Sequence, residues 1–110
     1  MDKVFNALAH ETRRQILDFV MQNAGALSGD ITAQFEVSRI AVSKHIKILE
    51  RANLLIIEKS GRERLHYFNP MPIQAIYDRW TDAYSQFFAP KLNAFKTEIE
   101  STEEAHEKTA

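Results

Sequence analysis

Residues 38–53 read SRIAVSKHIKILERAN and have the features of one short, capped helix. The hydroxyl of Ser38 can accept a hydrogen bond from the free amides of a first helical turn. At the other end, Asn53 tolerates the left-handed conformation that often follows a helix. The apolar residues between them recur at spacings of four and three and form one stripe that faces a core: Val42, Ile46 and Leu49.

The other faces of this helix carry basic and short polar side chains, namely Arg39, Ser43, Lys44 and Lys47. In the major groove of DNA, Arg and Lys can donate to guanine, and Ser can pair with any base. A helix that presents these residues from its N-terminal turns suits that groove. The alternative is the solvated face of an ordinary helix, and the helix alone does not decide between the two.

The charge distribution favours the DNA-binding interpretation. Residues 38–64 contain seven basic and three acidic side chains, a net charge of +4, although the whole chain carries −1. The flanking residues 1–37 and 65–110 carry −2 and −3. A concentrated positive segment presents an electrostatic footprint to phosphate even when the whole protein is nearly neutral.

A β-hairpin is predicted directly after this helix. Residues 54–58 and 64–69 are rich in strand-forming residues, and Ser60 and Gly61 can join them. The tip is basic and is expected to act as a wing that touches the DNA backbone. The predicted DNA-binding residues of the helix and wing are Ser38, Arg39, Ile40, Ser43, Lys44, His45, Lys47, Lys59, Arg62 and Arg64. Of these, His45 is expected to be partly packed, with a ring nitrogen that reaches phosphate.

Three shorter helices are predicted upstream. The first carries Val4, Phe5 and Leu8, and a break at His10 and Glu11 separates it from a second, which carries apolar residues from 16 to 21. After a loop at 25–29, Ser28 or Asp30 can cap a third helix, which carries Ile31, Ala33 and Phe35. Only residues 36–38 then remain before the capped helix, as in a helix-turn-helix. Arg13 or Arg14 either touches phosphate or pairs with Glu11 or Asp18.

The last predicted helix opens at Pro72 and carries an aromatic stripe. Pro90 should kink or restart this helix. We predict that residues 1–100 form one domain and that residues 101–110 form a disordered acidic tail. Aromatics at helical spacing can line a small-molecule pocket but are more often a core or a dimer seam. The predicted homodimer residues are Val4, Phe5, Leu8, Ile76, Tyr77, Trp80, Tyr84, Phe87 and Phe88.

The composition excludes several classes of protein. A chain of 110 residues with 45% apolar content supports one small core. It contains no cysteine, so disulfides and thiolate chemistry are absent. No segment has the roughly 18 uncharged apolar residues that a membrane span needs, and the N-terminus lacks the pattern of a secretion signal. A cytoplasmic protein without a membrane partner is expected.

The fold class expected from these patterns is mainly α with a small β-hairpin: a winged helix-turn-helix with a long C-terminal dimerisation helix. Roughly residues 2–90 resemble the ArsR/SmtB-type winged-helix repressors of bacteria. The resemblance rests on LAHETRRQIL at 8–17, VSRIAVSKHIKILERANLL at 37–55 and GRERLHYF at 61–68. It implies a homodimer that binds imperfect palindromes in double-stranded promoter DNA, represses transcription and is released by an effector.

The chain departs from the metal-sensing members of that family. It has no cysteine, and its four histidines are isolated from one another in sequence. Asp78 and Asp82 share a helix face, but two carboxylates are too few for a hard cation. We therefore expect no metal site and no cofactor, and a small molecule or a protein as the possible effector. Ile40 stands at a position that is commonly polar or Pro in the family, which leaves the base sequence open.

Two other function classes are weaker. A protein-interaction module that has lost DNA binding should carry acidic or apolar residues on the wing and helix, where this chain has basic ones. An enzyme needs a nucleophile with a base, paired carboxylates or a metal set in a cleft, and the sequence supplies none of these. The chain is therefore predicted to be a DNA-binding transcriptional regulator and not an enzyme.

Overall fold

The computed structural model describes the backbone of residues 1–109 and the side chains of residues 1–81 and 90–101. The chain forms two compact units, Met1–Ala75 and Ile76–Ala110. The last helix begins in the first unit and continues as the second, and the single domain over 1–100 stays a prediction. Among the described residues, no helix is both long and apolar enough to cross a membrane.

The first unit begins with α1 (Asp2–Leu8) and α2 (Glu11–Gln22), as the apolar spacing predicts. The predicted break between them has a local cause. His10 is the N-cap of α2, and its ring Nδ1 accepts a hydrogen bond of 3.1 Å from the backbone amide of Thr12. A side chain that satisfies a free amide of the first turn fixes where α2 begins.

The next segment differs from the sequence prediction. Residues 25–29 are not wholly loop, because Ala26–Leu27 form a short strand, β1. The helix α3 (Ser28–Thr32) follows at once and is shorter than predicted. Asp30 lies within its first turn, and its carboxylate accepts from the amide of Leu27 at 3.1 Å. After Thr32 the chain continues in tight turns with bonds between residues three apart, so the connection to the next helix is six residues long, not three.

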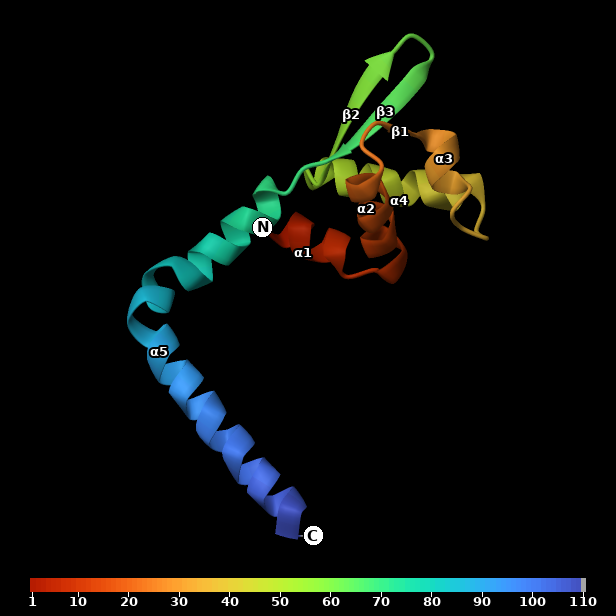
Figure 1. Cartoon of the computed structure of the whole chain (residues 1–110). Coiled ribbons are helices and arrows are strands. Elements are labelled where there is room, and N and C mark those ends of the chain that lie inside the picture. The colour runs from red at the N-terminus through yellow and green to blue at the C-terminus, as the bar shows by residue number, and fades with distance from the viewer. Residues whose placement is uncertain (110) are drawn as a thin grey trace. The chain divides into compact units, whose positions relative to one another are not determined.

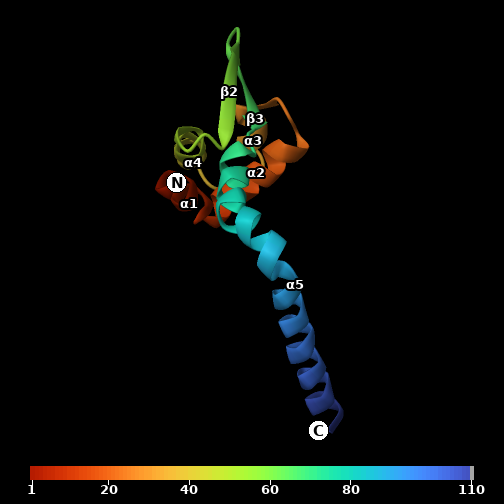
Figure 2. The same ribbon diagram turned by 90° about the vertical axis from the view of Figure 1, so that its left-hand side faces the viewer.

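The helix α4 (Arg39–Arg51) and the hairpin of β2 (Leu55–Ser60) and β3 (Glu63–Phe68) confirm the predicted order. The sheet has three strands, not two, in the order β1-β3-β2, and both pairings are antiparallel. β1 pairs only with Leu65 and His66, at the base of the hairpin. Figure 1 shows the hairpin projecting on the opposite side of α4 from α1, and Figure 2 shows α4 nearly end-on beside the base of the hairpin.

The core of the first unit lies where α2 packs against α4 and β3. The stripe of α4 faces this core as predicted. The fully buried side chains include those of Ile16, Val20, Ile31, Val42, Leu49 and Leu54. His66 is also buried, and its ring Nδ1 lies 2.8 Å from the carbonyl oxygen of Ala26, so the one buried imidazole among the described side chains is hydrogen bonded to β1.

The helix α5 (Met71–Thr109) begins in the first unit and makes up the second. Pro72 lies in its first turn, where a missing amide costs nothing. The helix continues through Pro90, where the sequence predicts a kink or restart. It also includes residues 101–109, where the sequence predicts a disordered tail; the Glu, Ala and Lys residues there are good helix formers.

Candidate nucleic-acid interface

Local sequence signals fix both ends of α4. The hydroxyl of Ser38 accepts from the amide of Ala41 at 3.1 Å, as an N-cap residue does. At the other end, Asn53 has a φ of 60°, the left-handed conformation that the sequence predicts for it. Ser38 thus marks where α4 begins, and Asn53 marks where the chain leaves it.

One face of α4 is exposed along its whole length. Ser43 and Lys44 lie three and four residues after Ile40, Lys47 lies four and three residues after these two, and all four are exposed. Arg39 is also exposed, at the first helical position. The face therefore carries the donors that the sequence predicts for base contacts.

The hairpin carries a second set of basic groups. Gly61 has a φ of +62°, which allows the tight turn at the tip, and Arg62 follows it there. Lys59 and Arg64 are directly opposite each other on β2 and β3, and both are exposed. Like charges at opposite positions destabilise a hairpin unless something of opposite charge lies between them. The exposed part of the hairpin therefore holds two cations side by side.

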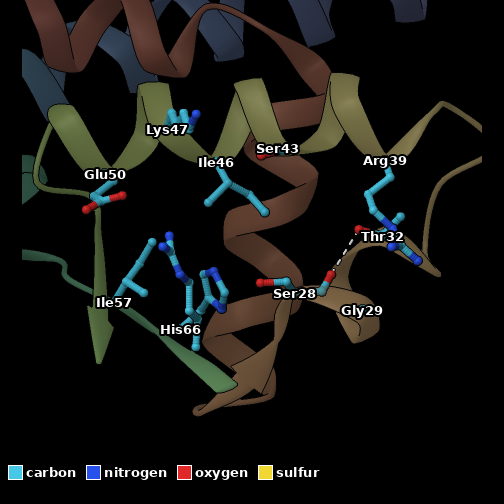
Figure 3. A pocket seen from close by; sticks show the side chains of 11 residues that line it. Ser28, Gly29, Thr32, Arg39, Ser43, Ile46, Lys47, Glu50, Ile57 and His66 are labelled. Carbon is cyan, nitrogen blue, oxygen red and sulfur yellow. Dashed lines mark hydrogen bonds between the residues drawn. The ribbon is translucent and has the colours of Figure 1, made fainter. Parts of the chain in front are cut away.

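A cleft of about 350 Å³ lies between α3, α4 and the hairpin. Figure 3 shows Ile46 pointing from α4 into this cleft, toward Ile57 and His66 of the sheet. One acidic residue, Glu50 of α4, lines it together with three basic residues from both elements: Arg39 and Lys47 from α4, and Arg64 from β3. The fold thus brings the positive charge of the helix and of the wing to one concave surface.

Six basic residues of α4 and the hairpin form no salt bridge within the described part of the chain. The six residues are Arg39, Lys44, Lys47, Lys59, Arg62 and Arg64. The salt bridge found among the described residues joins Lys96 and Glu100 of α5 and involves none of the six. Their charges are therefore available to phosphate.

His45 lies beside this face and is half-buried. A guanidinium N–H of Arg13 donates to its Nδ1 at 3.2 Å, and the His10 ring lies 4.5 Å away between centroids. Burial lowers the pKa of His45, and the nearby His10 and Arg13 add to this effect. Because arginine can only donate, Nδ1 of His45 must be unprotonated in this arrangement.

Arg13 and Arg14 act within the fold in a way that the sequence did not reveal. Arg13 is buried and donates to the carbonyl oxygens of Ala7 and Asn6 at 2.8 and 3.0 Å. Arg14 donates to the carbonyl oxygen of Leu8 at 2.8 Å. Both arginines therefore satisfy carbonyls at the C-terminal end of α1. Neither forms the predicted salt bridge with Glu11 or Asp18, and Arg13 is too buried to reach phosphate.

The residues predicted to form the dimer differ in exposure. Val4 is buried, and Leu8 and Ile76 are half-buried. Phe5, Tyr77 and Trp80 are exposed. The other three, Tyr84, Phe87 and Phe88, lie outside the described side chains.

No group of three or more His, Cys, Asp or Glu residues is placed to hold a metal ion among the described residues. Of the two carboxylates considered from the sequence, Asp78 is described and exposed, and Asp82 lies outside the described side chains.

Helix α4 after the turn-linked α3, with the basic hairpin beside it, defines a winged helix-turn-helix protein. Residues 8–58 match the family described as "Helix-turn-helix domain". The chain is 33% identical over 90 residues to the HTH-type transcriptional regulator Rv2034 of Mycobacterium tuberculosis, covering 78% of this chain and 83% of that protein. It is 31% identical over 74 residues to the transcriptional repressor SdpR of Bacillus subtilis, covering 67% and 81%.

A solved structure gives the same assignment. The ArsR-like transcriptional regulator from Rhodococcus sp. RHA1 is similar with a TM-score of 0.68 and 28% identity, over 91% of this chain and 90% of that one. The chain belongs to the ArsR-type family of winged-helix transcriptional regulators. The resemblance found in the sequence is thereby confirmed.

Proposed function

We propose that the protein is a homodimeric repressor that binds a palindromic site in promoter DNA. The proposal rests on one observation: Arg39 and Lys47 of α4 line the same cleft as Arg64 of the wing. Two different elements thus direct basic side chains that form no salt bridge to the same side of the first unit. A duplex has phosphates on both sides of its grooves and fits such a surface.

In this proposal the two elements have different roles. The N-terminal turns of α4 enter the major groove, where Arg39, Ser43 and Lys44 reach base edges. Lys59 and Arg62 of the wing contact backbone phosphates, which fixes the position of α4 without reading sequence. Phosphate between Lys59 and Arg64 would also relieve the repulsion between these two opposite residues.

The proposed dimer would use the aromatic stripe of α5. Tyr77 and Trp80 are 61% and 53% exposed, and such aromatic surface is usually covered by a partner. Two-fold symmetry would then place the two α4 helices about 34 Å apart, or a multiple of this distance, on one face of the duplex. A dimer of this kind reads an inverted repeat and, bound within a promoter, excludes the transcription machinery. The similarity to a named repressor supports this direction of control.

The alternative is an interaction module on the same scaffold that no longer binds DNA. It would leave six basic side chains without a ligand, and we favour DNA for that reason. The proposal includes no catalytic step and places the protein in the cytoplasm with its DNA. Release would come from a small molecule or a partner protein.

A selection from random duplexes should yield an inverted repeat, and fluorescence anisotropy would then measure affinity for it. The Arg39→Ala and Lys44→Ala double variant should bind at least tenfold more weakly, because each base contact contributes about 1 to 3 kcal/mol. The matched control is the double variant Lys91→Ala and Lys96→Ala, which removes the same charge from exposed positions in α5. Equal affinity of the two double variants would refute the assignment of α4.

A second measurement separates the roles of helix and wing. Arg62→Ala should weaken binding to all duplexes alike and should reduce the slope of log affinity against log salt by about one. Ser43→Ala should instead change the preferred sequence. A change of sequence preference with Arg62→Ala would contradict these roles.

The dimer is tested by sedimentation at micromolar concentration, which should give twice the chain mass of 12.7 kDa. Trp80→Asp should give the monomer, because it places a charge in the proposed apolar seam. A wild-type monomer whose Trp80 fluorescence is fully accessible to quencher would contradict the model.

A further inference from the structure

The solvent-facing side of α4 contains one large apolar residue, Ile40. Its side chain is 71% exposed, the highest value among the large hydrophobic residues that the structure describes. It lies on the face that continues with Ser43, Lys44 and Lys47. Ile40 therefore stands at the N-terminal end of an otherwise polar and basic surface.

The fold gives no reason for isoleucine at this position. The core side of α4 is complete without it, since Val42, Ile46 and Leu49 are buried there. β-branched residues also lower helix propensity relative to alanine. An exposed isoleucine thus gains nothing from burial in the first unit, and its apolar surface is available to a ligand.

The position of Ile40 limits which ligand it can meet. It is the second residue of α4, and the N-terminal residues of a recognition helix are those that contact base edges. In the major groove, the C5-methyl group of thymine is the apolar group on a base edge, and apolar side chains contact it. We propose that Ile40 reads a thymine methyl group in each half of the DNA site. This inference rests on the DNA-binding function proposed above.

The surrounding charge favours DNA over an apolar protein partner as the occupant. Arg39 precedes Ile40, Lys44 lies one turn later on the same face, and both are exposed. A protein surface that covered Ile40 would also have to neutralise these cations, whereas the phosphates of a duplex do so while a thymine methyl contacts the side chain. The mixed apolar and basic surface matches a thymine-containing major groove.

The test uses duplexes with a single modified base. In the selected inverted repeat, each thymine is replaced in turn by deoxyuridine, which removes only the methyl group. For the wild-type protein, each half-site should contain one thymine whose single replacement weakens binding about fourfold, the equivalent of about 0.8 kcal/mol for one methyl group removed from water. Ile40→Ala should bind the thymine and deoxyuridine duplexes equally at that position.

The matched control is Ile56→Ala. Ile56 is 53% exposed on β2, and because side chains alternate along a strand it points away from the cleft that Ile57 lines. This variant should keep the fourfold response to deoxyuridine. Both variants remove exposed apolar surface, so thermal melting should show that both are folded.

The outcomes separate this inference from the proposed function. Selection of a specific duplex whose affinity no thymine-to-deoxyuridine change alters would overturn the role of Ile40 and leave DNA binding intact. If Ile40→Ala keeps the fourfold loss of affinity for the deoxyuridine duplex, the role of Ile40 is likewise overturned and DNA binding stays intact. Failure to select any duplex would overturn the proposed function and this inference together.

Discussion

Replacing Arg13 with alanine should destabilise the protein far more than replacing its neighbour Arg14. Arg13 of α2 is 8% exposed and links this helix to α1 and to α4. It donates to the carbonyl oxygens of Asn6 and Ala7 in α1 and to His45 of α4. Without it, these carbonyls lose their partner in a place that water reaches poorly.

The magnitude follows from these contacts. A hydrogen bond from a charged donor contributes about 1.5 to 3 kcal/mol, so the two bonds to α1 give about 3 kcal/mol at the lower limit. Arg14 is exposed and makes one bond, to the carbonyl oxygen of Leu8. Water can replace that bond, and its loss should cost under about 1 kcal/mol. Both variants remove one positive charge. The difference between their losses of stability therefore reports the buried hydrogen bonds of Arg13.

Urea denaturation followed by circular dichroism measures the difference. With a dependence of about 2 kcal/mol per M urea, Arg13→Ala should lower the midpoint by about 1.5 M and Arg14→Ala by less than about 0.5 M. Both variants must be compared at one protein concentration, because dimerisation contributes to apparent stability. Equal midpoints for the two variants would refute the assignment of Arg13 as the link between α1 and α4.

Three further predictions concern pH, caps and metals. Burial lowers the pKa of His45 below 6.5, so the unfolded chain takes up a proton at this residue before the folded chain does as pH falls. The free energy of unfolding should therefore decline below about pH 6.5. In urea titrations, His45→Gln, which keeps a hydrogen-bond acceptor, should show a smaller decline. Ser38→Ala should cost about 1 kcal/mol in the same assay through the lost cap, whereas Asn53→Gly should cost little, because glycine also adopts a φ of 60°. Affinity for the selected DNA site should be equal in chelator and in micromolar zinc, nickel or copper. A tenfold loss of affinity on adding metal, about 1.4 kcal/mol, would instead show a metal site if the loss disappears in the Asp78→Ala and Asp82→Ala double variant.

The sequence predicted those features that have a local cause. The ends of α4 depend on Ser38 and Asn53 alone, and the core stripe depends on spacing within one helix, so both were predicted correctly. The hairpin depends on strand-forming residues around a glycine turn and was also predicted. The exposed face of α4 is the complement of its buried stripe, which is why the candidate site followed from the same reasoning.

The missed features depend on residues far apart in sequence. β1 is two residues long and exists because it pairs with Leu65 and His66, about forty positions later. The acceptors of Arg13 are backbone carbonyls, which every residue has, so no pattern of side chains identifies them. An arginine just after a short predicted helix is a signal that could have raised this possibility.

The strand order at the base of the wing determines how the wing adapts. β3 has a neighbour on both sides only at Leu65 and His66; beyond them, toward the tip, the hairpin is a two-stranded ribbon. Two-stranded ribbons twist and bend more readily than wider sheets. Arg62 and the pair of Lys59 and Arg64 all lie on the compliant part. In the proposed complex with DNA, the tip of the wing would therefore adjust to duplex backbones of different spacing while its base stays anchored by β1.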